Sequence, residues 1–297
     1  MITRTPRGVS TQPRVALATF SVFPHGDVDD AGLPAALGGA DFVVWDDPEA
    51  DWDRYDLVVV RSTWDYHARR DAFLDWADRL GPRLVNPPEL LAWNTDKRYL
   101  HEVAEAGLPV VPTTLVPPGA PFAAPAGEYV VKPTVSAGSR DTARFAGGAQ
   151  EQARAAGLVR DIHASGRTAM VQPYVASVDT RGETALLFFD GAFSHAIHKG
   201  PLLRPGQAPT SEVFAAETIE ARTASAAERD VAQRILAWVR QRFGAPPVYA
   251  RIDLVQDGNG APLLLELELT EPSLFFTQCS GAVERFAGAV LRRIPER

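Results

Sequence analysis

The sequence predicts an α/β protein built from α+β lobes, the first of which contains a parallel sheet. In the first third of the chain, short aliphatic runs alternate with polar stretches of helical periodicity, as expected for strands buried on both faces and joined by helices. The rest of the chain has further strands and helices with clear turn signals between them. A proline-rich stretch at residues 117–125 marks a loop or subdomain boundary within this second part.

The first lobe is expected to span residues 1–95. Its helix is predicted over residues 69–80, where Phe73, Leu74, Ala77 and Leu80 recur at helical spacing. Its strands are the compact apolar runs at residues 15–20, 42–45, 57–60 and 84–85.

Two further lobes are expected, over residues 96–175 and 176–297. A helix over residues 96–106, with Thr95 as its cap, opens the first of them. Strands are predicted at residues 129–131, 169–172, 184–189, 193–197, 248–255 and 263–269. Helices are predicted at residues 149–164, 224–243 and 282–293.

Composition excludes several classes of function. The net charge of −7, from 37 acidic and 30 basic residues, argues against general nucleic-acid binding. No apolar run is long enough to cross a bilayer, and residues 1–14 lack the apolar stretch of a signal peptide, so we expect a cytoplasmic protein that does not bind membranes. The single cysteine, Cys279, fits a reducing compartment and is more typical of a small packed residue than of a nucleophile.

The strongest local signal is the acidic strand at residues 263–271. Alternation places Leu263, Leu265, Leu267 and Leu269 on a core face, and Leu264, Glu266, Glu268 and Thr270 on the other face. A turn at Asn259-Gly260 would set Asp253 of the preceding strand opposite Glu266. Three carboxylates on one face suit Mg²⁺. The alternative is a solvated polar face, which we disfavour because only Arg251 is nearby to neutralise three acids that repel one another.

A second signal combines a lysine at a strand end with a loop of small residues. Lys132 ends the strand, and Ser136, Ala137, Gly138 and Ser139 follow, so backbone N–H groups could approach phosphate closely. The loop is not a Walker A motif, and an ordinary turn remains open. Lys97 is expected on the inward face of the helix over residues 96–106, as a phosphate contact or as a lysine that snorkels to solvent.

Two further segments could contact ligands. The strand through Gln172 ends at Tyr174 and Val175, where a free backbone edge beside an apolar wall can bind adenine, and Glu183 could hold ribose hydroxyls. Residues 61–66 end a parallel strand, where open α/β sheets bind ligands, so they form a candidate substrate rim. Ordinary packing of Trp64 is the alternative.

In this order, the segments resemble the ATP-grasp superfamily and its glutathione-synthetase-like branch over residues 84–285. The resemblance implies an ATP-grasp fold preceded by a parallel pre-ATP-grasp lobe. It implies that Lys97 and Lys132 contact the phosphates of ATP, that Ser136, Gly138 and Ser139 belong to a mobile covering loop, and that Gln172, Tyr174 and Val175 line the adenine site with Glu183 near the ribose. Lys199 and Arg251 would act at the transferred phosphate, and Asp253, Glu266 and Glu268 would bind Mg²⁺. Relatives usually have asparagine where this chain has Glu268.

The implied reaction is ligation with release of ADP and phosphate. ATP would phosphorylate a carboxylate or a ureido carbonyl of a small amino-acid-like substrate, which a nitrogen nucleophile then attacks. Among ATP-grasp enzymes of this size, the chain is most similar to the cyclo-ligases that close O-ureido-D-serine to D-cycloserine. A dipeptide-type ligase and a non-catalytic nucleotide-binding regulator are the alternatives. Family habit implies a homo-oligomer.

Overall fold

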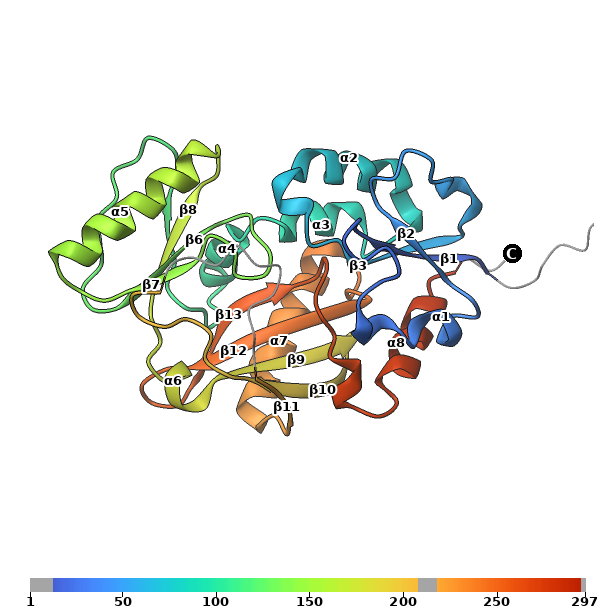
Figure 1. Ribbon diagram of the computed structural model, residues 1–297. Coiled ribbons are helices and arrows are strands. Elements are labelled where there is room, and N and C mark those ends of the chain that lie inside the picture. The colour runs from blue at the N-terminus through green and yellow to red at the C-terminus, as the bar shows by residue number, and fades with distance from the viewer. Residues whose placement is uncertain (1–12, 208–217, 295–297) are drawn as a thin grey trace, which may run out of the picture.

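Three sheets form the framework of the computed structural model, which describes residues 13–207 and 218–294. The N-terminal lobe, in blue and cyan, and a small lobe, in green, lie on opposite sides above a central sheet in yellow and orange (Figure 1). None of the helices in the described ranges is long and apolar enough to span a membrane.

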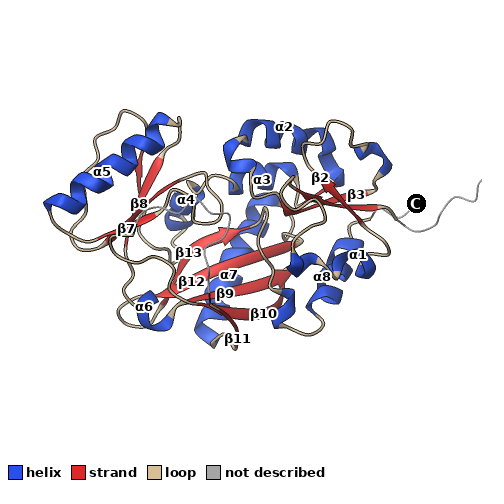
Figure 2. Cartoon of the chain, viewed as in Figure 1, coloured by secondary structure: helices blue, strands red, loops and turns tan. Residues whose placement is uncertain are grey.

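The N-terminal sheet is parallel, as its aliphatic runs predicted. Its strands follow the order β2 (Asp41–Val44), β1 (Val15–Thr19), β3 (Leu57–Ser62) and β4 (Leu84–Val85). The helices of this lobe are α1 (Leu33–Ala36), α2 (Arg70–Leu80) and α3 (Pro88–Asn94). Helices α2 and α3 cover one side of the sheet (Figure 2).

The small lobe has an antiparallel sheet with α5 (Ala149–Ala164) along its outer side (Figure 2). Its strands follow the order β5 (Thr114–Val116), β8 (Ala169–Pro173), β6 (Tyr129–Pro133) and β7 (Ala143–Phe145). Strands β5 and β7 were not predicted; each has only three residues, too few for a periodic signal.

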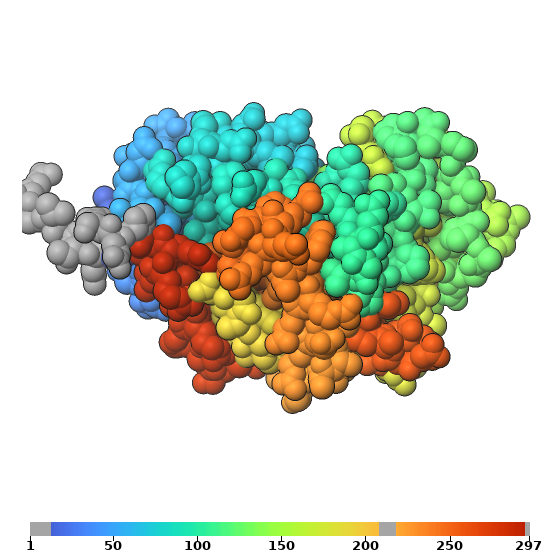
Figure 3. All heavy atoms as spheres, turned by 180° about the vertical axis from the view of Figure 1, so that it is seen from behind, coloured from blue at the N-terminus to red at the C-terminus, as the bar shows by residue number. Residues whose placement is uncertain are grey.

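The central sheet is antiparallel and carries the acidic hairpin. Its strands follow the order β11 (Ile219–Arg222), β10 (Ala192–Lys199), β9 (Glu183–Phe189), β12 (Tyr249–Gln256) and β13 (Pro262–Glu268). Helix α7 (Ala226–Phe243), orange in the centre of Figure 3, covers it from behind. It begins with a capping box between Ser225 and Glu228, which satisfies N–H groups at its first turn. The remaining helices are α4 (Tyr99–Glu105), α6 (Val178–Arg181) and α8 (Ala282–Leu291).

The predicted helix over residues 96–106 begins later than expected. Thr95 is the C-cap of α3, and α4 starts only at Tyr99, so Thr95 closes one helix instead of opening the next. Lys97 lies in the turn between them, and its backbone N–H donates to Thr134 O at 2.8 Å. This bond joins the turn to the loop that follows β6. Lys97 therefore belongs to a turn and not to a helix.

A β-bulge corrects the predicted face pattern of β13. Asp253 pairs with Glu266, but Leu254 pairs with Leu264, so Leu265 is the extra residue. The bulge reverses the two faces on its N-terminal side. Leu264 is fully buried in the core against α7, whereas Leu263 and Leu265 join an apolar cluster with Tyr174 and Val175 of the small lobe.

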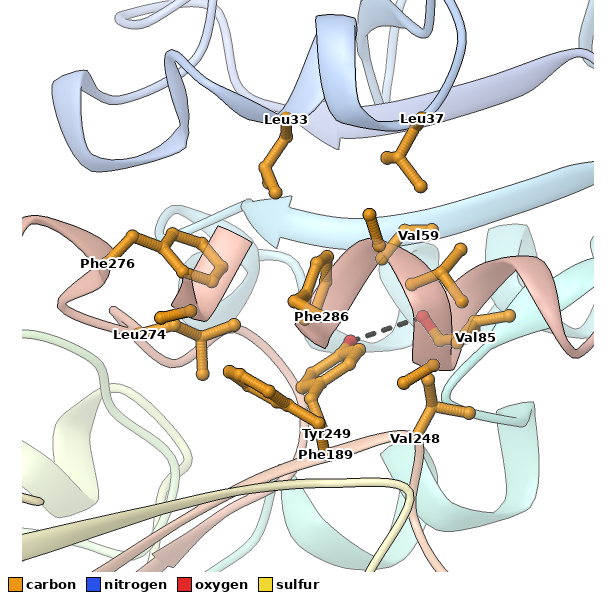
Figure 4. Close-up of a cluster of buried hydrophobic side chains, with 14 of the residues drawn as sticks. Leu33, Leu37, Val59, Val85, Phe189, Val248, Tyr249, Leu274, Phe276 and Phe286 are labelled. Atoms are coloured by element: carbon orange, nitrogen blue, oxygen red, sulfur yellow. Dashed lines mark hydrogen bonds between the residues drawn. The ribbon is translucent and has the colours of Figure 1, made fainter. Parts of the chain in front are cut away.

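A buried contact joins the N-terminal lobe to the central sheet. Tyr249 of β12 packs against Phe286 of α8 beneath Val59 and Leu33 (Figure 4). The Tyr249 hydroxyl lies 2.8 Å from Thr270 O, 3.1 Å from Val60 O and 3.2 Å from Val85 O. The two lobes thus share one hydrophobic core.

Candidate active site

A cavity of about 380 Å³ lies where the three lobes meet. The small lobe contributes the wall with Gln172 and Tyr174, and the central sheet contributes the acidic hairpin. The N-terminal lobe contributes the segment after β3. Every residue named above for ATP, metal or catalysis lines this cavity: Lys97, Lys132, Ser136, Gly138, Ser139, Gln172, Tyr174, Val175, Glu183, Lys199, Arg251, Asp253, Glu266 and Glu268. The fold thus gathers segments far apart in the sequence.

Two lysines from different segments meet at Glu266. The Lys97 ammonium lies 3.2 Å from Glu266 Oε1 and donates to Ser136 O at 2.9 Å. Lys132 is also buried, and burial lowers its pKa, with Glu266 opposing that shift and Lys97 adding to it. A pair of buried ammonium groups beside a small-residue loop is suited to polyphosphate.

The three expected metal ligands lie together but are ion-paired. Asp253 sits opposite Glu266 in register, as predicted, and Arg251 sits opposite Glu268. Lys199 is 3.2 Å from Asp253, and Arg251 contacts both Asp253 and Glu268. The expectation that Arg251 is the only cation near these acids is therefore wrong, because Lys97 and Lys199 arrive from other segments. Within the described ranges, no three acidic, histidine or cysteine side chains are gathered closely enough to form a metal cluster.

The crowding of negative charge shows in the pKa values. Burial, reinforced by Glu266 and Asp253 against the opposing Arg251, raises the pKa of Glu268 to about 7. Burial also disfavours the charge on the other two acids, but Arg251 and Lys199 hold the pKa of Asp253 below its ordinary value, and Lys97 and Lys132 do the same for Glu266. Three carboxylates gathered on one face are the oxygen donor set that suits Mg²⁺.

The small-residue loop covers one side of the cavity. Ser136 is buried, and Val135 and Ala137 pack against the core of the N-terminal lobe. Gly138 and Ser139 both have positive φ, 64° and 57°. Ser139 adopts this left-handed conformation without the freedom of glycine, which indicates that the loop's contacts fix its path.

The opposite wall has the features of a nucleotide-base pocket. Gln172 is buried and donates to Thr113 Oγ1 at 3.0 Å. The guanidinium of Arg144 lies 3.4 Å from the Tyr174 ring centroid, and the Tyr174 hydroxyl donates to Asp179 at 2.7 Å. Because of the bulge, Leu265 adds an apolar surface here that simple alternation assigned to the opposite face.

The remaining expected residues divide between this cavity and other places. Glu183, expected near ribose, lies 3.2 Å from the Lys199 ammonium. Trp64 and Tyr66 line the cavity, as expected for a substrate rim. Cys279 is half-buried outside the cavity lining, where its thiol accepts from Arg285 at 3.2 Å. Sequence reasoning missed Glu271, which also lines the cavity; its position directly after the acidic strand was the available signal.

Comparisons with known proteins identify the family. Residues 15–86 match the family model described as the N-terminal domain of the D-cycloserine synthetase DcsG. The cycloserine biosynthesis protein DcsG of Streptomyces lavendulae is 40% identical over 264 residues, which cover 84% of this chain and 87% of that protein. The chain belongs to the DcsG family.

Solved structures agree with membership of the DcsG family. The crystal structure of D-cycloserine synthetase DcsG has a TM-score of 0.84 at 37% identity, covering 95% of this chain and all of that one. A D-alanine–D-alanine ligase from Bacillus anthracis has a TM-score of 0.64 at 10% identity, covering 95% and 97% of the two chains, a likeness of fold alone. The expected ATP-grasp fold is confirmed, and the DcsG-family chain is an ATP-dependent, ADP-forming ligase.

Proposed function

We propose that this chain is a cyclo-ligase that uses ATP to close O-ureido-D-serine to D-cycloserine. The observation that carries the proposal is the cavity's set of four cations, Lys97, Lys132, Lys199 and Arg251, beside paired acids in a relative of DcsG. Four positive groups around one cavity suit a polyphosphate and an acyl phosphate.

The connectivity of D-cycloserine decides which substrate group is activated. Its ring amide joins the serine carbonyl carbon to the nitrogen attached to the side-chain oxygen. Of the two groups considered from the sequence, the carboxylate is therefore favoured over the ureido carbonyl. A carboxylate oxygen attacks the γ-phosphorus and ADP leaves; the oxygen-bound nitrogen then attacks the acyl phosphate, loses its proton and displaces phosphate. The carbamoyl group left on that nitrogen departs with one water as carbon dioxide and ammonia.

This chain's residues would position and neutralise the reacting groups. Lys97 and Lys132 would bind the phosphates, and Lys199 and Arg251 would stabilise the transferred group. The loop with Ser136, Gly138 and Ser139 would exclude water from the acyl phosphate. Gln172, Tyr174 and Val175 would line the adenine pocket, with Glu183 near the ribose.

Asp253, Glu266 and Glu268 would hold Mg²⁺, which supplies charge neutralisation at the transferred phosphoryl group. In the structure the acids and cations neutralise one another, with Lys97 3.2 Å from Glu266 and Lys199 3.2 Å from Asp253. Phosphates and Mg²⁺ together would give both sets of side chains new partners.

The test is substrate-dependent ADP release. The protein is incubated with ATP and Mg²⁺ and with O-ureido-D-serine, with D-alanine as both substrates of a dipeptide ligase, or with no second substrate. ADP and D-cycloserine are then quantified. We expect ADP and D-cycloserine in equal amounts with O-ureido-D-serine, and neither product in the other two incubations. ADP release only with D-alanine would show a dipeptide-type ligase and would overturn the proposal. Lys132→Met, which keeps the stem and removes the charge, serves as the matched inactive control.

A further inference from the structure

One acidic side chain of the cavity differs from all the others. Five acids are among the described residues that line it: Glu183, Asp253, Glu266, Glu268 and Glu271. The first four form ion pairs with Lys97, Lys199 or Arg251. Glu271 makes no ion pair with any residue in ranges 13–207 and 218–294. The cavity thus presents one carboxylate that the protein's own cations do not neutralise.

The surroundings of Glu271 are arranged to hold a carboxylate in place. Tyr66, which is buried and lines the same cavity, lies close enough to Glu271 for each side chain to shift the pKa of the other. The Trp64 indole N–H donates to the backbone carbonyl of Glu271 at 3.0 Å. Tyr66 and Trp64 come from the segment after β3, so the N-terminal lobe fixes an acid that belongs to the C-terminal half of the chain.

The residues after Glu271 are held in the same way. Arg61 donates to Pro272 O at 3.2 Å, and Arg251 donates to Ser273 O at 3.3 Å. Three consecutive carbonyl groups are therefore bound by three different side chains. A backbone held at each residue gives the Glu271 side chain a fixed origin, which is what selective recognition requires.

We infer that Glu271, positioned by the side chains that hold the backbone of residues 271–273, binds the primary ammonium group of the substrate and makes the enzyme selective for amino acids. The inference rests on the proposed function and specifies how its substrate is recognised. A half-buried carboxylate that lines a cavity without an ion pair is suited to a cationic ligand, and the substrate's ammonium is the cation that the proposed reaction brings to this cavity.

The titration of Glu271 agrees with a missing cation. Burial, together with the nearby Glu268, raises the pKa of Glu271 to about 8, although Lys97 acts in the opposite direction. An ammonium ion beside the carboxylate would favour its charged form. An amine-free ligand would leave the group half-buried and without an ion pair.

The experiment compares two substrates that differ only in the amine. O-ureido-D-serine and 3-(ureidooxy)propanoate share the carboxylate and the ureido group, and only the first carries an ammonium. For the wild type we expect KM, or Kd measured by calorimetry with an ATP analogue present, to be at least tenfold lower for O-ureido-D-serine than for 3-(ureidooxy)propanoate. Glu271→Gln should raise the KM or Kd for O-ureido-D-serine roughly ten- to a hundredfold. The value for the amine-free compound and the affinity for ATP should stay nearly unchanged.

Controls separate recognition from a structural role. Glu105→Gln changes an exposed acid outside the cavity and should behave as wild type. Glu271→Asp keeps the charge and should restore part of the discrimination. Equal loss with both compounds, or a fall in kcat without a change in KM, would overturn the inference. If Glu271→Gln does not fold, equal binding of the two compounds by the wild type overturns it as well.

Failure of the proposed function gives a different result. If O-ureido-D-serine elicits no ADP, D-serine, D-alanine and their amine-free counterparts are tested in the same way. The inference survives if an accepted amine loses its advantage in Glu271→Gln, even though the ureido substrate is wrong. It is overturned if no amine is accepted or if amine-free counterparts are equally good.

Discussion

At the scale of single residues, the cavity balances its charge through pairs from distant segments. Lys97 precedes α4 and Glu266 lies in β13, yet their charged groups are 3.2 Å apart. Sequence reasoning placed Asp253 opposite Glu266 from strand alternation and an expected turn at Asn259-Gly260. In the structure the loop between the strands is longer, and the bulge at Leu265 restores that pairing. Sequence reasoning could not supply the partners of these acids, because no local pattern tells which lysine of another segment will arrive.

Glu266 gives the prediction at this scale. Glu266→Gln removes one proposed Mg²⁺ ligand and should lower kcat/KM roughly a hundred- to a thousandfold. Because Lys97 and Lys132 lower the pKa of Glu266, its charge stabilises the fold above the ordinary carboxyl range. The variant should therefore be slightly less stable at neutral pH, and the difference should vanish as pH falls through the folded pKa. Steady-state kinetics at varied Mg²⁺ and urea unfolding at several pH values check both.

The exposed Glu105→Gln is the matched control for Glu266→Gln, and neither its turnover nor its pH-dependent stability should change. Near-wild-type turnover of Glu266→Gln at limiting Mg²⁺ would remove Glu266 from the metal site. The repulsion expected between unpaired acids would instead have predicted a more stable variant.

At the scale of elements, regular secondary structure followed from the sequence and its irregularities did not. Helix α5 (Ala149–Ala164) matches its predicted range because its apolar stripe is long and periodic. The bulge at Leu265 carries no such signal, since leucine stands at every position from 263 to 265 and either face could be apolar. The break before Tyr99 depends on a backbone bond from Lys97 to Thr134, a tertiary contact.

The loop over residues 135–141 gives the prediction for an element. In the structure it is held by the bond from Lys97 to Ser136 O at 2.9 Å and by an ion pair from Arg167 to Asp141 at 2.6 Å. Phosphates would compete for Lys97, while the loop's own N–H groups would gain acceptors. We expect hydrogen exchange of this loop to slow at least several-fold with an ATP analogue and Mg²⁺, while residues 149–164 stay unchanged.

Gly138 is the residue that tests the mechanism of the loop. Its φ of 64° is strained for any residue with a side chain, so Gly138→Ala should weaken the nucleotide-dependent protection. Equal exchange of the loop with and without nucleotide would show a fixed turn and contradict the covering role.

At the scale of the whole molecule, the N-terminal lobe and the central sheet are joined by buried polar contacts as well as by their shared core. Arg61 of β3 pairs with Asp30 at 2.8 Å, and both side chains are only 2% exposed. The same guanidinium donates to Pro272 O beyond β13. The Arg61–Asp30 pair lies within the N-terminal lobe, whereas the bond to Pro272 O crosses to the segment after β13, so the loss of that bond should lower global stability.

Tyr249 tests this coupling without touching the cavity. Its hydroxyl is buried among the carbonyl oxygens of Val60 and Val85 in the N-terminal sheet and of Thr270 beyond β13. Tyr249→Phe keeps the ring against Phe286 and removes the shared donor. We expect the free energy of unfolding to fall by about 1–3 kcal/mol, since buried acceptors lose a partner. Affinity for an ATP analogue should not change, because Tyr249 does not line the cavity.

Tyr55→Phe is the matched control, because that hydroxyl bonds Asp41 at 3.0 Å within the N-terminal lobe and the Asp41 side chain is 49% exposed. A solvated acceptor can bond to water once the tyrosine hydroxyl is gone, so this variant should lose less stability than Tyr249→Phe. Urea unfolding followed by tryptophan fluorescence, together with calorimetric titration of the analogue, measures both quantities. Equal destabilisation by the two substitutions would show that the Tyr249 hydroxyl between the lobes contributes no more to the free energy of unfolding than the Tyr55 hydroxyl does. A parallel loss of nucleotide affinity in Tyr249→Phe would show that the junction also sets the geometry of the small lobe.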